Sequence, residues 1–273
     1  MKKVKSKFGP WALITGASSG IGEEFAQQLA RTGLNLVLVA RRGDVLQETT
    51  DYLSKTHNIK TRVISADLSD PQTVDALPEK VADIDIGLVI SNAGADSMGA
   101  LIKVDPAVLR SMYSLNTYPH LAFTRYFSER MLKRKAGAIV LVSSMAGLQG
   151  TAFGANYSAA KAYILNLGEA VNRELRDTGI NLTVLVPGPT DTPAVGPRDD
   201  IDFSKMPVSP MKVSAVVRGT LKAVLVNKPV YVPGVMNRVL AFVTRRAMSR
   251  STASAMMSAM MKKAVPDHLK VTL

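Results

Sequence analysis

The sequence predicts an α/β protein with a doubly wound, mostly seven-stranded parallel sheet and helices on both of its faces. Three observations lead to this prediction. Short runs of β-branched and leucine residues alternate with longer amphipathic stretches, which indicates βαβ units. Runs such as 36–40 and 139–142 are almost entirely apolar, as strands buried on both faces are. A glycine-rich turn also joins the first strand to the first helix.

The elements follow from this alternation in chain order. The expected strands are residues 12–15, 35–40, 60–65, 86–91, 138–143, 181–186 and 229–232. The expected helices are residues 21–32, 45–55, 71–81, 106–134, 154–177 and 213–226. Asp70 precedes Pro71 and suits the N-cap of the third helix. Because there is no internal repeat and no long polar linker, we expect one domain over 1–273 with a core at about 10–232.

Two segments fall outside the alternation. Six prolines lie between residues 187 and 210, so the stretch at about 189–212 is expected to be a lid or an irregular loop. Residues 234–273 form a basic, methionine-rich extension with a helical pattern. Methionine makes adaptable apolar surfaces, which suit a subunit contact or packing first, then a cover over an apolar substrate, then a membrane surface. The methionines concerned are Met206, Met211, Met256, Met257, Met260 and Met261.

The net charge of +12 is concentrated at the two ends of the chain. Residues 1–10 hold four lysines and no acid, and residues 228–273 hold eight Lys or Arg against one acid, Asp267. The remainder is nearly neutral, whereas a nucleic-acid-binding protein more often carries a basic stripe across its fold. We therefore expect no nucleic-acid partner. Basic ends favour solubility, and peripheral contact with an anionic membrane is the less favoured interpretation.

Several kinds of site are excluded by composition. The chain has no cysteine, so it has no disulfide, thiol nucleophile or cysteine metal ligand, and a reducing, cytoplasmic location is expected. Its first residues do not resemble a signal peptide, and no apolar run is long enough to predict a spanning helix. His57, His120 and His268 have no partner spacing. We expect them to be surface or packing residues and expect no metal.

The stretch TGASSGIG at residues 15–22 is typical of a dinucleotide-binding turn. Gly16, Gly20 and Gly22 let the backbone turn sharply and approach a phosphate, and the following helix offers free N–H groups. The preceding strand and the following helix supply the context that this motif requires. Other residues of the turn expected to contact the cofactor are Ser18, Ser19 and Ile21.

The end of the second strand predicts which nucleotide binds. An acidic residue about twenty positions after the glycines usually binds the adenosine ribose hydroxyls. Arg41 and Arg42 occupy that region instead, and a guanidinium there pairs with a 2′-phosphate. We therefore expect NADP(H). Asp67, followed by Leu68, is expected at the adenine end, since its carboxylate suits the adenine amino group.

Six motifs in one order identify a family resemblance. They are TGASSGIG at 15–22, NAG at 92–94, Asn116 in SLNTYP, Ser144 in VLVSSMAG, YSAAK at 157–161 and PG at 187–188. Together they resemble the single-domain short-chain dehydrogenase/reductase family, of Rossmann type, over about residues 10–232. The stretches PWALITGASSGIG and GLNLVLVARR also resemble the branch that contains 3-oxoacyl-CoA reductases and 17β-hydroxysteroid dehydrogenases.

The resemblance implies that Tyr157 is the general acid/base that exchanges a proton with the substrate oxygen. A free phenol has a pKa of about 10, and a nearby cation lowers it. Lys161 lies one helical turn after Tyr157, so both side chains share a face. No other tyrosine has a lysine four residues later. Tyr163 has a leucine there instead and is expected to pack in the core.

The resemblance also implies roles for polar residues around this pair. The family serine polarises the substrate carbonyl, and the interval of thirteen residues before Tyr157 favours Ser144 over Ser143. Asn116 is expected to interrupt its helix and to hold a water that links Lys161 to solvent. The further cofactor contacts that we expect are Asn92, Ala93, Gly94, Tyr157, Lys161, Pro187, Gly188, Thr190 and Thr192. The residues expected to line the substrate pocket are Met145, Leu148 and Phe153.

The sequence thus predicts an NADP(H)-dependent oxidoreductase that interconverts an apolar ketone or aldehyde with its alcohol. A non-catalytic NADP(H)-binding regulator on the same fold is the alternative, although such a protein would be expected to lack part of the reacting set. A methyltransferase is a third class, and the two arginines and the YSAAK segment argue against it. A homodimer or homotetramer is expected, as is common in the family.

Overall fold

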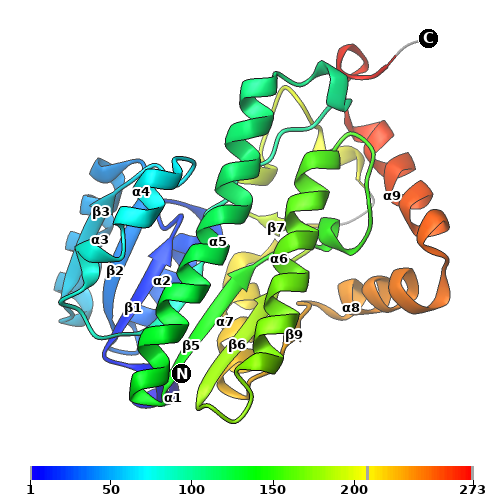
Figure 1. The fold of residues 1–273 in the computed structure, drawn as a ribbon. Coiled ribbons are helices and arrows are strands. Elements are labelled where there is room, and N and C mark those ends of the chain that lie inside the picture. The colour runs from blue at the N-terminus through cyan, green and yellow to red at the C-terminus, as the bar shows by residue number, and fades with distance from the viewer. Residues whose placement is uncertain (1, 207–208, 272–273) are drawn as a thin grey trace.

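The computed structural model describes residues 2–206 and 209–271, and it contains the predicted parallel sheet (Figure 1). Every neighbouring pair of strands in the sheet is parallel, in the order β3-β2-β1-β4-β5-β6-β9. The predicted fold class is confirmed. The strands are β1 (Trp11–Thr15), β2 (Asn35–Ala40), β3 (Thr61–Ser65), β4 (Ile86–Ser91), β5 (Gly137–Val142), β6 (Ile180–Leu185) and β9 (Val230–Tyr231). Pro207 and Val208 of the expected lid, with Met1, Thr272 and Leu273, lie outside the described residues.

Helices cover both faces of the sheet because alternate strand residues point to opposite faces. In β1, Leu13 belongs to the core under α4, α5 and α6, whereas its neighbour Ile14 belongs to the core under α2, α3 and α7. Both side chains are fully buried. The bounds of these helices are α2 (Gly20–Ala30), α3 (Gly43–His57), α4 (Pro71–Ala76), α5 (Pro106–Arg134), α6 (Ala155–Glu174) and α7 (Val213–Leu225).

The direction in which strands are added reverses between β1 and β4. The chain first builds outward through β2 and β3, and it then returns to the other side of β1 for β4, β5 and β6. Loops that leave the carboxyl ends of β1 and β4 therefore diverge to opposite faces of the sheet. A crevice at such a reversal is where open α/β sheets bind their ligands.

The N-terminal segment was predicted to be a basic end outside the core, and the structure differs from this prediction. It forms a further helix, α1 (Lys2–Phe8), which packs against α7. Val4 and Phe8 are fully buried, and the Lys7 ammonium donates to the carbonyl of Leu225 at 2.8 Å. The lysines dominate the composition of this segment, but two apolar residues one helical turn apart are enough to bury one face.

The helix expected over 71–81 is shorter. It ends as α4 at Ala76, and a separate 3-10 turn spans Glu79–Val81. Pro78 has no backbone N–H and disfavours helix in the residue before it, which accounts for the break. Asp70 caps α4 as predicted, accepting hydrogen bonds from the backbone N–H groups of Gln72 and Thr73.

The long helix α5 is continuous, so the prediction that Asn116 interrupts it was wrong. Asn116 is fully buried, and its side-chain amide donates to the carbonyl of Met112, four residues earlier, at 2.9 Å. That bond lies along the helix and leaves the backbone ladder in place. Pro119 is also accommodated within the helix.

The lid and the extension meet above the carboxyl edge of the sheet (Figure 1). The lid contains β7 (Thr190–Asp191), which pairs with β8 (Met211–Lys212), and the extension contains α8 (Val235–Phe242) and α9 (Arg250–Ala264). A separate apolar cluster joins the two segments through Ile201 and Met261. Among the described residues, no helix is long and apolar enough to cross a bilayer.

Candidate active site

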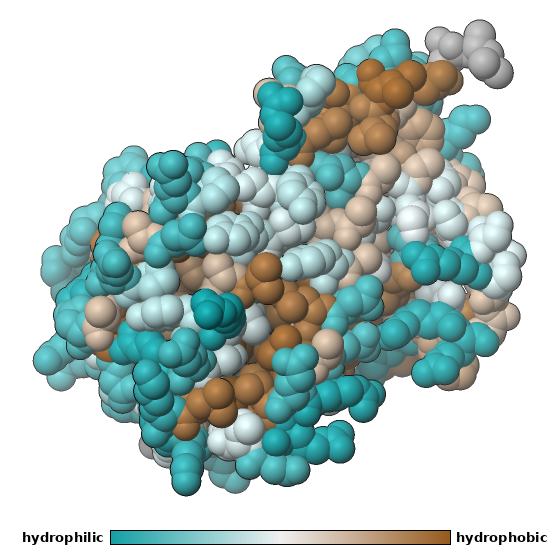
Figure 2. Space-filling view, in the orientation of Figure 1, coloured by the Kyte–Doolittle hydropathy of each residue, from teal (hydrophilic) through white to brown (hydrophobic). Residues whose placement is uncertain are grey.

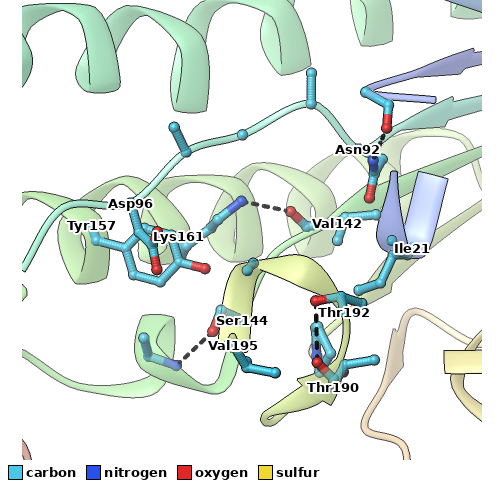
Figure 3. A pocket seen from close by; sticks show the side chains of 18 of the residues that line it. Ile21, Asn92, Asp96, Val142, Ser144, Tyr157, Lys161, Thr190, Thr192 and Val195 are labelled. Atoms are coloured by element: carbon cyan, nitrogen blue, oxygen red, sulfur yellow. Dashed lines mark hydrogen bonds between the residues drawn. The ribbon is translucent and has the colours of Figure 1, made fainter. Parts of the chain in front are cut away.

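A cavity of about 800 Å³ opens at the carboxyl edge of the sheet (Figure 3). Of the residues expected to contact the cofactor, all except Gly22 line it. We call the part formed by the glycine turn and the loops after β2, β3 and β4 the coenzyme half. The part beyond Tyr157, closed by residues 193–206 of the lid and by α9, is the substrate half. One cavity therefore brings together segments from both ends of the chain.

The glycine turn leaves no room for side chains. Gly16 and Gly20 have φ of +64° and +59°, in the left-handed region that favours glycine. A Cβ on Gly22 would lie 2.2 Å from the carbonyl oxygen of Gly16, which explains this residue although it does not itself line the cavity. The side chain of Ser19 does not cap α2, so the first N–H groups of that helix are available to an anion. The turn therefore fits a pyrophosphate.

Two guanidinium groups stand at the adenosine end of the coenzyme half. Both Arg41 and Arg42 are exposed and line the cavity. Arg42 donates to the carbonyl and the hydroxyl of Ser18, at 3.2 and 3.1 Å, which places it on the glycine turn. Asp67 also lines the cavity, and its carboxylate accepts from the backbone and hydroxyl of Ser69. The guanidinium groups of Arg41 and Arg42 are hydrogen-bond donors that suit a nucleotide with an additional phosphate.

The end of β4 forms the floor of the coenzyme half. Thr15, which sequence reasoning did not select, accepts hydrogen bonds from the backbone N–H groups of Asn92 and Ala93 at 2.9 and 3.0 Å. The Asn92 amide donates back to the carbonyl oxygens of Thr15 and Gly16. These bonds fix the NAG loop to the glycine turn. The threonine of TGASSGIG, at the end of a strand, is the sequence signal that was available for this role.

A buried histidine supports the same floor. His120 on α5 contacts the hydroxyl of Ser91 at 2.8 Å and the carbonyl of Ala93 at 3.2 Å. Burial, together with the positive charge of Lys161, lowers the pKa of His120 to about 3. The ring is therefore neutral at physiological pH, and the predicted packing role is confirmed. His57 is half-buried and His268 is exposed.

The reacting residues meet at the border between the two halves. Tyr157 and Lys161 extend from one face of α6, with the Lys161 ammonium 5.6 Å from the centre of the tyrosine ring (Figure 3). Lys161 is buried and donates to the carbonyl of Val142 at 3.1 Å. A Cβ on Gly94 would lie 2.7 Å from the Asn116 Oδ1 and 3.1 Å from the Lys161 Nζ. Gly94 therefore lets Asn116 and Lys161 approach each other, although Asn116 itself does not line the cavity.

The two neighbouring serines have different surroundings. Ser143 is buried, and its hydroxyl donates to the carbonyl of Lys161 at 2.7 Å, where it helps to hold α6. Ser144 is half-buried, accepts from the N–H of Ala146 at 3.1 Å and lines the cavity on the side of Tyr157, where its hydroxyl can donate to a ligand oxygen (Figure 3). Because a carbonyl oxygen needs a donor, this geometry favours Ser144.

The electrostatics around Tyr157 differ from the sequence prediction. Burial and then the negative charge of Asp96 raise the pKa of Tyr157, while the Ser144 hydroxyl and Arg198 act in the opposite direction. Burial also lowers the pKa of Lys161 to about 8. The protein groups therefore favour the neutral phenol, which is the form that donates a proton. The expected lowering of the Tyr157 pKa by Lys161 is not found, and loss of contact with water dominates.

The substrate half is largely apolar, but its lining differs from the expected residues. Met145 lines it, whereas Leu148 packs against the core that includes α5 and α6, and Phe153 packs into the cluster between lid and extension. For the substrate half, sequence reasoning named only methionines among the lid residues, and it did not select Asp96. The lining residues from the lid, the extension and the loop after β4 include Asp96, Met98, Val195, Ile201, Phe203, Met206, Met257 and Met261.

Tyr163 does not pack in the core as predicted. It is 39% exposed on the outer face of α6. Leu121 and Leu132 are exposed on α5, and Figure 2 shows hydrophobic side chains along the face where these two helices lie. Six residues after Tyr157, the chain has turned by about 600°, which places Tyr163 well away from the face that Tyr157 and Lys161 share.

Within residues 2–206 and 209–271, no three His, Cys, Asp or Glu side chains gather as they would around a metal ion. The chemical groups at this site are a phenol, an ammonium, a hydroxyl and a set of anion-binding backbone groups. Such a set suits a dinucleotide and a proton-exchanging reaction at an oxygen.

Residues 10–201 match the family model described as short chain dehydrogenase. The chain belongs to the short-chain dehydrogenase family. A 7beta-hydroxysteroid dehydrogenase from Mediterraneibacter gnavus is 30% identical over 70% of this chain and 73% of its own length. A very-long-chain 3-oxoacyl-CoA reductase from Neurospora crassa is 34% identical over 66% of this chain and 56% of its own length. The resemblance that the sequence carries, including the narrower one, is confirmed.

A solved structure shows the same relationship. The short-chain dehydrogenase from Sphingobium yanoikuyae in complex with NADPH is 30% identical, with a TM-score of 0.79 over 88% of this chain and 94% of its own. Because these relatives are dehydrogenases and reductases, the chain is an oxidoreductase of the class that acts on CH–OH and C=O groups. Its fold binds a nicotinamide cofactor.

Proposed function

We propose that this short-chain dehydrogenase uses NADP(H) to interconvert an apolar ketone or aldehyde with its alcohol, with Tyr157 as general acid/base. The observation that carries the proposal is the meeting of Tyr157, Lys161 and Ser144 at one point of a cavity whose coenzyme half fits a dinucleotide. This arrangement has each group that proton exchange at a carbonyl oxygen requires.

Each residue has a defined part in this reaction. The Ser144 hydroxyl donates to the carbonyl oxygen and stabilises the negative charge that develops there. Tyr157 transfers its proton to that oxygen during reduction and takes it back during oxidation. Lys161, with a pKa of about 8, is mostly protonated near neutral pH and favours the phenolate once the proton has left. The bound nicotinamide supplies or accepts the hydride.

Asn116 acts through Lys161. Its side chain bridges the loop after β4 by accepting from the N–H of Ala95 and donating to the carbonyl of the same residue. This leaves Asn116 beside Lys161 and Gly94. We propose that it positions the lysine and a water that returns protons to it from solvent.

The preference for NADP(H) rests on Arg41 and Arg42. Both line the adenosine end of the cavity, and Arg42 is held on the glycine turn by Ser18. A guanidinium forms strong, often bidentate hydrogen bonds with a phosphate, which NAD lacks at this position. The relative from Sphingobium yanoikuyae, with NADPH bound, supports the same choice.

The substrate class follows from the lining of the substrate half. Met98, Phe203 and Met257 are among the residues that form an apolar surface large enough for more than a small ketone. Relatives that act on 7β-hydroxysteroids and on very-long-chain 3-oxoacyl-CoA also support a bulky, mainly apolar substrate. The contribution of α9 supports the interpretation of the extension as a cover. We do not favour a non-catalytic regulator, because the reacting set is complete.

We further propose that copies of the chain associate through the outer face of α5 and α6. Exposed apolar and aromatic side chains lie on both helices, including Tyr113, Leu121, Leu132 and Tyr163. Light scattering after size-exclusion chromatography measures the mass of the assembly and thus whether copies of the chain associate. A cytoplasmic location stays a prediction that rests on the cysteine-free sequence.

The experiment that tests the function is a screen of ketones, aldehydes, steroids and 3-oxoacyl thioesters, following NADPH and NADH oxidation separately. We expect the highest kcat/KM with NADPH and a bulky, uncharged ketone. A preference for NADH would contradict the cofactor proposal, and turnover limited to small charged carbonyl compounds would contradict the substrate class.

A further inference from the structure

An ion-paired trio joins the lid to the loop after β4. The Arg198 guanidinium donates to Asp96 at 2.5 Å and makes two parallel hydrogen bonds with Asp200, at 2.8 and 2.7 Å. Asp200 also accepts from the backbone N–H of Met98 at 2.7 Å. Two segments about one hundred residues apart are thus connected directly. A bidentate arginine in a network of this kind is geometrically specific, unlike an isolated surface pair.

The trio is protected from water. The side chains of Asp96, Arg198 and Asp200 are only 20–23% exposed. By contrast, Asp83 forms a bidentate pair with Arg62 on β3 and is 63% exposed. Burial opposes the charged form of both groups, but hydrogen bonds from Arg198 and from the Met98 N–H still lower the pKa of Asp200, and the two carboxylates still raise the pKa of Arg198. Arg198 and Asp200 are therefore both charged over the physiological range.

Within the trio, Asp96 faces the reacting residues. It lines the cavity, whereas Arg198 and Asp200 do not. It follows Ala95, which the Asn116 side chain holds at both its N–H and its carbonyl. Asp96 and Tyr157 both line the cavity (Figure 3), and the charge of Asp96 acts on both Tyr157 and Lys161. Asp96 is thus positioned where a substrate carbonyl and its immediate substituents would lie.

The trio retains a negative charge. One guanidinium is shared by two carboxylates, so the sum of the three formal charges is −1. Of the described residues that line the substrate half, Asp96 and Lys161 alone carry charged side chains. Lys161 is also needed beside Tyr157, and its Nζ is directed to the carbonyl of Val142. An anionic group next to the reacting carbonyl would therefore meet Asp96 in a site with little water to screen it.

We propose that Asp96 is a specificity-determining residue, held beside Tyr157 by Arg198 and Asp200, which makes the site select uncharged carbonyl compounds over those with an anionic group next to the carbonyl. Arg198 and Asp200 are positioning residues that act through Asp96 and fix residues 193–206 of the lid over the cavity. This inference rests on the proposed function and adds the charge preference of its substrates.

A matched pair of substrates tests the charge preference. Ethyl benzoylformate and benzoylformate share the same reacting ketone and differ in the charge beside it. We expect Asp96→Asn to lower the ratio of kcat/KM for the ester to that for the acid by about ten-fold. The intrinsic difference in reactivity cancels because the ratio is compared between variants. Asp83→Asn removes the same charge from the exposed pair with Arg62 and is expected to leave the ratio unchanged.

An unchanged ratio in Asp96→Asn, with NADPH affinity and thermal unfolding like those of the unsubstituted protein, would overturn the role of Asp96. If the unsubstituted protein reduces neither compound nor any other uncharged ketone with NADPH or NADH, the proposed function itself fails. Failure of the proposed function can be distinguished from failure of the role of Asp96, because the attachment of the lid by Arg198 is measured without any substrate.

Proteolysis measures the attachment of the lid without any substrate. Chymotrypsin cleaves after aromatic residues, and Phe203 lies in the segment that Arg198 fixes. Mass spectrometry of the products should show cleavage after Phe203 several times faster in Arg198→Met than in the unsubstituted protein. Arg62→Met, which breaks the exposed pair, should leave that rate unchanged. Equal rates in all three proteins would show that Arg198 does not hold the lid.

Discussion

The two halves of the cavity are built in different ways. The coenzyme half is made by backbone and short side chains at the ends of adjacent strands, and hydrogen bonds among Thr15, Gly16 and Asn92 hold it together. The substrate half is made by larger side chains from the lid, the loop after β4 and α9, joined by apolar packing and the Arg198 trio. One half is fixed by the sheet, and the other depends on segments that pack on it from a distance.

Cofactor binding depends on a geometry that many proteins share, whereas substrate selection depends on side chains that are particular to one protein. A dinucleotide phosphate needs N–H groups and close backbone approach, which the same strand–turn–helix geometry always supplies. A substrate is selected by the shape and charge of side chains on variable segments supported by a rigid scaffold. Substitutions in the two halves should therefore affect different kinetic constants, and the following predictions test that separation.

The largest effect is expected at the border of the two halves. Tyr157→Phe should lower kcat for ketone reduction by about a thousand-fold, because the proton donor is lost while the ring remains. The dissociation constant of NADPH, measured by fluorescence titration, should be nearly unchanged. Tyr163→Phe, which removes the hydroxyl of the exposed tyrosine, is the matched control and should keep full activity. Appreciable turnover by Tyr157→Phe would refute the proposed mechanism.

The next effect concerns the coenzyme half alone. Arg42→Ala should lower kcat/KM for NADPH by about thirty-fold, since a charged hydrogen bond to the 2′-phosphate is lost. The kcat/KM for NADH should change little, and the KM for the ketone should stay the same. Arg31→Ala, an exposed arginine at the other end of α2, serves as control. An equal decrease in kcat/KM with NADPH and with NADH would mean that Arg42 does not bind the 2′-phosphate.

The floor of the coenzyme half should also be sensitive to acid. The folded-state pKa of His120, about 3, lies below the unfolded value of 6.5, so only the unfolded chain takes up a proton between these values. The stability that the neutral ring contributes is complete above pH 6.5 and is lost as the pH falls toward 3. At pH 5 the loss is about 2 kcal/mol.

Urea unfolding at pH 7 and pH 5 measures this loss. His120→Gln should have a lower free energy of unfolding than the unsubstituted protein at pH 7, because its packing is disturbed. Between pH 7 and pH 5, however, its free energy of unfolding should fall by about 2 kcal/mol less than that of the unsubstituted protein. His57→Gln, at a half-buried position, should retain the pH dependence of the unsubstituted protein. If His120→Gln keeps the same dependence, the buried ring is not its source.

The smallest effect is expected in the substrate half. Met257→Ala removes apolar surface contributed by α9 and should raise the KM for a bulky ketone about five-fold. The KM for a small ketone and the affinity for NADPH should stay the same. Met236→Ala makes the identical change at a side chain that is 75% exposed on α8. If Met257→Ala weakened NADPH and ketone binding alike, the two halves would not be separable.

Sequence reasoning was most successful where function depends on backbone geometry or on local spacing. The parallel sheet, the glycine turn and the pairing of Tyr157 with Lys161 follow from patterns within about twenty residues, and the structure brings them to one cavity. It was less successful where distant parts meet. Leu148 and Phe153 are close to Tyr157 in sequence but do not line the cavity, while Met257, a hundred residues later, does.

The fold, the cofactor-binding turn and the order of the reacting residues can be predicted from the sequence, because hydrophobic periodicity and glycine placement act locally. The tertiary structure is needed to see that one face of the N-terminal helix is buried, that Tyr163 is exposed and that burial raises the pKa of Tyr157. It also decided that Asp96 meets Arg198 beside the reacting centre. Burial and charge depend on what surrounds a side chain in space, and no pattern along the chain records those neighbours.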